Sequence, residues 1–269
     1  MQSQTRDPLV TTARAKPGQI AYGGGIGILL LEDVYPGFPG DLRNASAWGF
    51  PIQYEMVPNL DIYRLVEEPG RDLDIYIEPI VQAALRLQNR YGCRAIAAEC
   101  GFFAYFQKHV AAALDVPVFM SSLLQINWIQ SIIGPDKKVG VYTSSLDQLS
   151  DKHLEAVNTT TGSNYVLFDF YDCVSSTDNP ETNKLWNTAG LRPDVPGADY
   201  ALLEKQMVEA AREMVLREPA LGAILLECTG YQPFGRAIQA ATGLPVFSWS
   251  TLLDFAWSAA SHRDFYGHV

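Results

Sequence analysis

Short apolar runs alternate along this chain with longer segments whose apolar residues recur at helical spacing. Runs of four to six Val, Ile, Leu and Ala residues are typical of strands buried in a parallel sheet. We predict strands at 27–31, 52–57, 95–98, 116–119, 139–142, 166–169, 223–226 and 244–247. Helices are predicted at 73–90, 103–114, 121–133, 146–157, 200–216, 233–242 and 250–260. Strands that alternate with helices in this way indicate an α/β fold with parallel sheets.

The strand–helix pattern repeats after 128 residues (228 − 100). Residues 95–124 and 223–252 align without a gap, and the identical pairs include Glu99/Glu227, Cys100/Cys228, Phe106/Phe234, Pro117/Pro245 and Ser122/Ser250. A match of this quality indicates a duplicated structural unit. We therefore predict two pseudo-symmetric lobes, each an open, doubly wound parallel sheet. Residues 23–120 plus 250–269 are assigned to the first lobe, 121–249 to the second, and 1–22 to a polar N-terminal arm.

The repeat singles out two of the four cysteines. Cys100 and Cys228 each follow a predicted strand and precede a predicted helix. Ligands of open α/β sheets bind beyond the carboxyl ends of the strands, so we expect both thiols to face an active site in the cleft between the lobes. Cys93 and Cys173 are interpreted as small core residues. The turn-rich segment 37–41 is expected at the mouth of the cleft, and the polar segment 171–196 is a candidate lid.

Two thiols placed in this way can move a proton between the two faces of one carbon atom. Backbone N–H groups at a helix start lower a thiol pKa and can hold a carboxylate or an enediolate. One cysteine then acts as general base while the other acts as general acid. Glu99 and Glu227 would raise the thiol pKa if they faced the cysteines, but strand alternation is expected to turn them away. Structural and functional roles stay equally open for both carboxylates.

Other polar residues end neighbouring predicted strands. Thr229 follows Cys228, and Thr143, Ser144 and Ser145 follow the strand at 139–142. Their hydroxyl and amide groups are candidates for binding a substrate carboxylate. The alternative is that Ser144 or Ser145 only caps the helix predicted from residue 146.

Composition and charge narrow the range of partners. The formal net charge of −10 disfavours binding to nucleic acid or to an anionic membrane, without excluding a small anionic substrate. No apolar run reaches the roughly 18–20 residues of a membrane span, and the N-terminal stretch lacks a secretory core, so we expect a cytoplasmic protein. The cysteines and histidines show no metal-ligand spacing. The glycines at 23–25 precede a strand instead of following it, so a dinucleotide is not expected. The sequence has no GxxxxGK(S/T) motif and no lysine that stands out for a pyridoxal Schiff base, so we expect a mechanism without a cofactor.

The two cysteine motifs, ECGFF and ECTGY, resemble the two signatures of the aspartate/glutamate racemase superfamily. That superfamily includes hydantoin racemases, maleate isomerases, arylmalonate decarboxylases and a dimethylsulfoniopropionate lyase branch. The resemblance extends over about residues 25–262, and CGFFAYFQ…VPVFMSSLLQ is similar to a little-characterised racemase-like branch. It implies a two-lobed fold, a cofactor-independent reaction and a homodimer.

The resemblance assigns roles position by position. Cys100 and Cys228 correspond to the acid/base pair, while Thr229 and the loop of Thr143, Ser144 and Ser145 correspond to the groups that bind the substrate carboxylate. The loop after the first strand, LEDVYPGFPGD, lacks the Asp-Ser pattern usual in the amino-acid racemases. The chain also departs from these racemases after its two cysteines, where many of them have Asn-Thr after the first cysteine and often His after the second Cys-Thr. The residues that stand there, and that we expect to line a larger or less polar substrate pocket, are Gly101, Phe102 and Gly230.

These observations lead to one principal hypothesis and two alternatives. The principal one is a racemase or epimerase that moves the α-proton of a small-molecule carboxylate substrate, an amino acid or a derivative of one, by means of the two cysteines. The first alternative is a lyase or isomerase of the same superfamily, by β-elimination as in dimethylsulfoniopropionate lyases or by maleate-type cis–trans isomerisation. The second is a small-molecule binding protein without catalysis.

Overall fold

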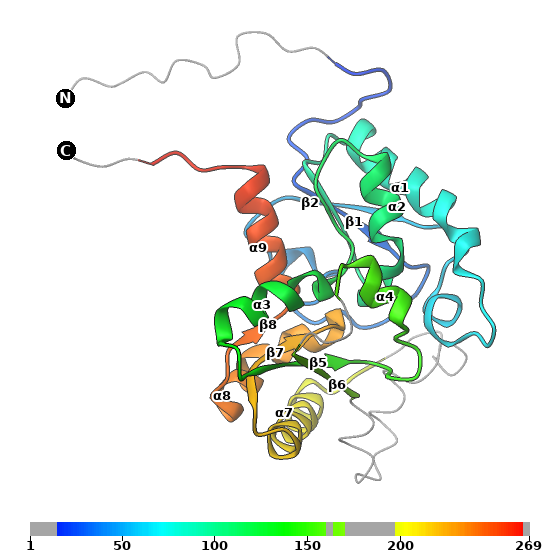
Figure 1. Ribbon diagram of the computed structural model, residues 1–269. Coiled ribbons are helices and arrows are strands. Elements are labelled where there is room, and N and C mark those ends of the chain that lie inside the picture. The colour runs from blue at the N-terminus through cyan, green and yellow to red at the C-terminus, as the bar shows by residue number, and fades with distance from the viewer. Residues whose placement is uncertain (1–14, 160–163, 170–196, 266–269) are drawn as a thin grey trace, which may run out of the picture.

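The computed structural model describes residues 15–159, 164–169 and 197–265. These residues form two four-stranded sheets in which all neighbouring strands are parallel. Figure 1 shows the sheets in separate halves of the molecule, with helices around each. The predicted α/β fold with two parallel sheets is thereby confirmed. The candidate lid at 171–196 and Cys173 lie outside the described residues.

The two sheets have the same strand order. The first has the order β2-β1-β3-β4, with the strands Ile26–Leu30 (β1), Ile52–Met56 (β2), Ala95–Ala98 (β3) and Val118–Phe119 (β4). The second has the order β6-β5-β7-β8, with Lys138–Thr143 (β5), Tyr165–Asp169 (β6), Leu221–Leu226 (β7) and Val246–Phe247 (β8). The duplicated segments therefore occupy equivalent places, β3 and β7 each lying second from one edge.

The central strands carry no polar face. All four residues of β3 are buried, and so are five of the six residues of β7. Such continuous burial requires helices on both faces of a parallel sheet. The flanking helices are Ile77–Arg90 (α1) and Gln107–Ala113 (α2) in the first half, and Tyr200–Arg217 (α7) and Gly235–Thr242 (α8) in the second.

Two helices cross from one half to the other. Ile126–Ile133 (α3) follows β4 of the first sheet but contacts β5 and β7 of the second. Trp249–Ala260 (α9) follows β8 of the second sheet and buries Trp249 and Leu253 in a cluster with Ile26 and Ile28 of the first. In Figure 1, α9 is the red helix that extends from β8 toward the half that holds β1 and β2. Each half therefore covers part of the other.

The interior is continuous between the halves. One apolar cluster contains Leu29 and Ala98 of the first sheet together with Val141 and Leu225 of the second. The short helix Asp151–Ala156 (α4) packs against the turn that follows β3. The lobe boundaries given above stay a prediction.

Several element boundaries differ from the prediction. The helix expected at 146–157 begins only at Asp151, because Ser150 caps it and the Leu146 amide donates to Asp169 Oδ2 instead (2.8 Å). The helices expected from residues 103 and 233 begin earlier, as the 3₁₀ turns Gly101–Phe106 and Thr229–Phe234. The 3₁₀ turn Ser122–Gln125 likewise precedes α3. The strands β4 and β8 are two residues long, each beginning after a proline, which has no N–H to donate.

Candidate active site

Both cysteines occupy the position between a strand and a 3₁₀ turn. Cys100 precedes the turn Gly101–Phe106, and its carbonyl accepts from the Phe103 amide (3.0 Å). Cys228 precedes the turn Thr229–Phe234, and its carbonyl accepts from the Tyr231 amide (3.1 Å). The equivalent local geometry follows from the equivalent sequences, and it places each thiol at the carboxyl end of its sheet.

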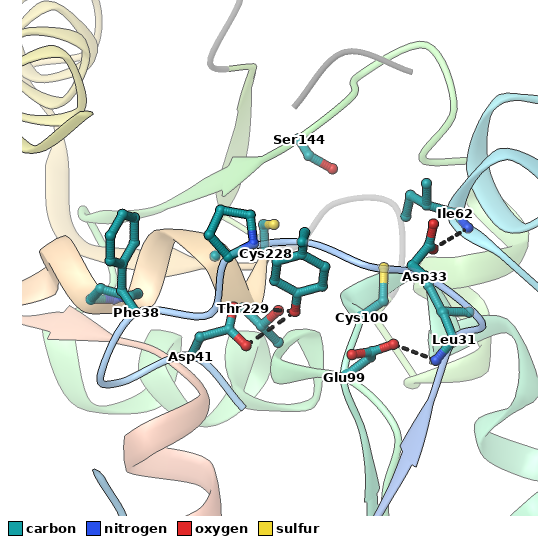
Figure 2. A pocket seen from close by; sticks show the side chains of 14 residues that line it. Leu31, Asp33, Phe38, Asp41, Ile62, Glu99, Cys100, Ser144, Cys228 and Thr229 are labelled. Carbon is teal, nitrogen blue, oxygen red and sulfur yellow. Dashed lines mark hydrogen bonds between the residues drawn. The ribbon is translucent and has the colours of Figure 1, made fainter. Parts of the chain in front are cut away.

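The two cysteines line the same cavity, which Figure 2 shows from close by. Its volume is about 70 Å³, far below the roughly 300–1,000 Å³ of pockets for drug-sized ligands. The cavity therefore has the size for a compact small molecule. The other lining residues are Leu31, Asp33, Tyr35, Pro36, Phe38, Asp41, Ile62, Glu99, Ser144, Thr229, Gly230 and Pro233.

Three of the predicted binding residues lie at this cavity. Ser144, Thr229 and Gly230 line it together with both cysteines. Thr229 and Gly230 open the 3₁₀ turn after Cys228, where the first backbone N–H groups have no acceptor within the helix. Such N–H groups are suited to bind a carboxylate.

The other four predicted binding residues do not line the cavity. Gly101 and Phe102 are buried behind Cys100, and the Phe102 ring lies 5.3 Å from the His153 ring, centroid to centroid. Thr143 is fully buried and donates its hydroxyl to a neighbouring carboxylate instead, while Ser145 is absent from the lining. Direct contact of these four residues with a substrate stays a prediction.

Glu99 and Glu227 are used in the same way in the two halves. The Leu31 amide, directly after β1, donates to Glu99. The Ser144 amide, directly after β5, donates to Glu227 Oε2 (3.4 Å). Each carboxylate therefore ties the end of the central strand to the segment that carries a cysteine. The sequence leaves open whether Glu99 and Glu227 have structural or functional roles, and these hydrogen bonds give both of them a structural role.

Arg43 makes the surroundings of Glu99 different from those of Glu227. Its guanidinium forms an ion pair with Glu99 and also donates to the Leu31 carbonyl (2.7 Å). Burial raises the pKa of Glu99, and Arg43 opposes that rise. The guanidinium also stacks on the Tyr35 ring, 4.6 Å from its centroid. Arg43 is thus fully engaged by groups of the first half.

Among the described residues, Glu227 has no comparable partner. Its side chain is 0 % exposed, the Thr143 hydroxyl donates to Oε2 (3.0 Å), and Oε1 accepts no hydrogen bond from the described residues. Burial raises the pKa of Glu227 to about 7; Thr143 and Ser144 oppose the rise and Asp169 adds to it. This carboxyl group therefore changes its protonation state near neutral pH.

The Cys100 thiol differs from the expectation that a helix start lowers its pKa. Burial raises its pKa well above the usual value, the negative charges of Glu227 and Cys228 raise it further, and the Phe102 amide opposes them. The preceding carboxylate, Glu99, makes the smallest contribution. The carboxylate that acts most on Cys100 therefore comes from the other half of the molecule, which strand alternation does not reveal.

The loop after β1 forms another wall of the cavity that both cysteines line. From the sequence we expect only residues 37–41 of this loop, at the mouth of the cleft. The Tyr35 hydroxyl donates to Asp41 Oδ1 (3.0 Å), and burial raises the pKa of both groups. A charge on Cys228 also raises the Tyr35 pKa, so the phenol lies near that thiol. Phe38 packs edge-on against Tyr200, with ring centroids 5.2 Å apart. The wall is therefore aromatic and acidic.

Two further features bear on cofactors and membranes. Among the described residues, no group of three or more His, Cys, Asp and Glu side chains is arranged to hold a metal ion. Within the same ranges, no helix has the length and apolar character needed to cross a membrane.

Solved structures with a similar fold include a decarboxylase and an aspartate racemase homologue. The Gly74Cys mutant of arylmalonate decarboxylase superposes with a TM-score of 0.55 at 17 % identity, covering 91 % of this chain and 98 % of that one. An aspartate racemase homologue from Pyrococcus horikoshii superposes with a TM-score of 0.55 at 14 % identity, covering 88 % and 99 %. The chain has the aspartate/glutamate racemase fold. The fold that the two cysteine motifs imply is thereby confirmed, and no protein-family model matches the sequence.

Among curated proteins, the racemase-fold chain is similar to lyases. A dimethylsulfoniopropionate lyase of Durusdinium sp. clade D is 28 % identical over 235 residues, which cover 86 % of this chain and 73 % of that protein. Dimethylsulfoniopropionate lyase 5 of Emiliania huxleyi is 25 % identical over 252 residues, 90 % of this chain and 46 % of that protein. The chain thus spans about three quarters of the first relative and less than half of the second.

Proposed function

We propose that this protein is a lyase that acts on dimethylsulfoniopropionate or a close analogue. The observation that carries the proposal is its sequence likeness to lyases of that name over 86 % and 90 % of the chain. The sequence alone favours a racemase and leaves a lyase as the alternative, and this likeness favours the lyase.

Elimination from this substrate needs a single base. The base removes a proton from the carbon beside the carboxylate, and that electron pair forms the carbon–carbon double bond. The bond from the next carbon to sulfur breaks, so that acrylate and dimethyl sulfide are released. The sulfide leaves as a neutral molecule and needs no proton. Racemisation, in contrast, needs one group on each face of the carbon.

The difference between the two thiols supports a one-base reaction. Burial and the negative charge of Glu227 favour the protonated form of Cys100. Cys228 then acts as the base that takes the proton, and the Cys100 thiol donates to the carboxylate as negative charge develops on it. The Thr229 hydroxyl and the Gly230 amide hold the same carboxylate, because both line the cavity beside Cys228.

The wall formed by the loop after β1 suits the sulfonium group. Aromatic faces and carboxylates attract an onium cation, and Tyr35, Phe38, Asp33 and Asp41 all line the cavity. Arg43, the nearby cation, is bound to Glu99 and so does not oppose a positive ligand. The cavity therefore has a negative, aromatic side for the sulfonium group and an amide-bearing side for the carboxylate.

The test is the conversion of dimethylsulfoniopropionate by the purified protein. Dimethyl sulfide is measured in the headspace by gas chromatography and acrylate by NMR. C228S is expected to lower kcat by about 100-fold or more, the range for loss of a general base. C93A is the matched control, because Cys93 is a core thiol whose pKa burial raises to about 12. Absence of product from the folded wild-type protein, or full activity of C228S, contradicts the proposal.

Racemisation is the second candidate, because both thiols line one cavity in a racemase fold. Its signature is exchange of the α-proton of an amino acid or derivative in heavy water, together with formation of the opposite enantiomer. Such exchange must be lost in both C100S and C228S. Exchange without elimination would replace the lyase by the racemase.

A further inference from the structure

The two halves handle equivalent buried carboxylates in unequal ways. Glu99 and Glu227 precede the two cysteines and bind equivalent backbone amides. Glu99 has the Arg43 guanidinium as its counter-ion. In the part of the chain that the structure describes, no Lys or Arg forms an ion pair with Glu227, which is as completely buried as any residue of the core.

The unpaired oxygen of Glu227 lies over the residue that follows Cys100. A Cβ atom placed on Gly101 would lie 1.8 Å from Glu227 Oε1 and 2.4 Å from Cδ, both far inside contact distance. The carboxyl group therefore occupies the space in which a side chain of residue 101 would lie. A group from the second half therefore stands against the residue that follows Cys100, and its negative charge raises the pKa of the Cys100 thiol.

The Glu227 carboxyl group is also held in place. Thr143 donates to Oε2 from β5, and the Ser144 amide donates to the same oxygen. Both donors leave Oε1 directed toward Gly101 without a hydrogen bond from the described residues. In a buried site without a counter-ion, a fixed negative charge acts strongly on a neighbouring ionisable group.

We propose that Glu227 is a positioning residue that keeps Cys100 in its thiol form from across the molecule and thereby leaves Cys228 as the base. The assignment of the base rests on the lyase function proposed above; the effect of Glu227 on Cys100 does not. A thiol opposite a carboxylate resists ionisation because two negative charges would share one low-dielectric site. The duplicated fold thus acquires unequal cysteines, because within the described ranges Glu99 has a cationic partner and Glu227 does not.

Other ionisable groups also act on Cys100 and Glu227. Cys100 also faces Cys228 and Glu99, and the charge of Glu99 is offset by Arg43. Glu227 also faces Asp169, which accepts from the Leu146 amide (2.8 Å). The pKa of Glu227 is about 7, so its carboxyl group becomes negatively charged as the pH rises through neutrality. That charge then disfavours the thiolate form of Cys100 more strongly.

The experiment measures the ionisation of Cys100 without any substrate. The wild-type protein and E227Q are treated with iodoacetamide between pH 6 and 10, and the alkylated Cys100 peptide is quantified by mass spectrometry. Only the thiolate reacts, so the rising part of the rate profile moves along the pH axis with the thiol pKa. E227Q is expected to move this profile down by about one pH unit or more, roughly a tenfold faster reaction at pH 8. E218Q is the matched control, because Glu218 precedes β7 at the end opposite Cys228, and its profile should match the wild type.

A second variant keeps the proposal testable if E227Q does not fold. T143V removes the hydroxyl that donates to Glu227, so the Glu227 carboxyl group is more often neutral at pH 7. Cys100 should then be alkylated faster than in the wild-type protein. T143S keeps a hydroxyl at this position and should restore the wild-type rate. Unchanged Cys100 profiles in folded E227Q, or in T143V, overturn the proposal. Because no substrate is present, inactivity toward dimethylsulfoniopropionate leaves this result unaffected.

Discussion

At the scale of single residues, Gly101 is the position where the site tolerates least change. Its missing side chain is replaced by the Glu227 carboxyl group. G101A is therefore expected to lower the free energy of unfolding by about 1–3 kcal/mol, the usual cost of overpacking a buried site. Urea denaturation measures the loss.

The control for this prediction is G49A, because a Cβ on Gly49 would meet no atom within 4 Å. A second comparison uses G101A in the background of E227A, where the competing side chain is gone. There the added loss from G101A should be smaller than in the wild-type protein. Equal losses in the two backgrounds would show that Glu227 is not the obstacle.

The sequence was sufficient to find the pair of cysteines but not what makes them different. The repeat places Cys100 and Cys228 in equivalent positions, and the structure brings both to one cavity. The contact between Gly101 and Glu227, and the counter-ion Arg43, join residues far apart in the chain. Neither is encoded in any local pattern, so the raised pKa of Cys100 could only follow from the three-dimensional arrangement.

At the scale of elements, the strands were predicted well because buried parallel strands are continuous apolar runs. The start of α4 was predicted wrongly for an equally local reason. Apolar spacing extends back to Leu146, whereas Ser150 and His153 form a capping box that fixes the start at Asp151. The Ser150 amide donates to His153 Nδ1 (3.2 Å). A histidine that acts as a cap is easily overlooked, because Glu or Gln is the usual residue at this position.

This cap predicts a pH dependence of stability. Burial lowers the pKa of His153 to about 4, and the positive charge of Arg71 lowers it further. Because the folded pKa lies below the unfolded value of 6.5, the stabilisation is complete above pH 6.5 and is lost as the pH falls toward 4. Its size is on the order of 3 kcal/mol. H153N, which cannot titrate, should show a smaller loss of unfolding free energy between pH 7 and pH 4.5.

The comparison must be made as a difference between variant and wild type. Glu227 has a folded pKa above its unfolded one, so its contribution falls as the pH rises from about 4.5 to about 7. The two groups therefore oppose each other over nearly the same pH range in the wild-type protein. A parallel pH dependence of H153N and wild-type unfolding would contradict the role assigned to His153.

At the scale of the whole molecule, the two halves should unfold together. One apolar cluster contains strands of both sheets, and α3 and α9 each cover the half that they do not follow. Urea unfolding monitored by far-ultraviolet circular dichroism and by tryptophan fluorescence is expected to give coincident single transitions. Two separated transitions would mean that the sheets are independent domains.

The reciprocal placement of α3 and α9 has a consequence for the origin of the chain. A protein of half this length, with four strands and one terminal helix, would present an apolar sheet face that its own helix does not cover. Two copies could bury those faces by exchanging terminal helices, as domain-swapped dimers do. Joining the copies end to end would preserve the exchange, and from then on each cysteine could acquire its own surroundings. In this view the difference between Glu99, which pairs with Arg43, and Glu227 became possible only after the gene that encoded a symmetric dimer had been fused into one.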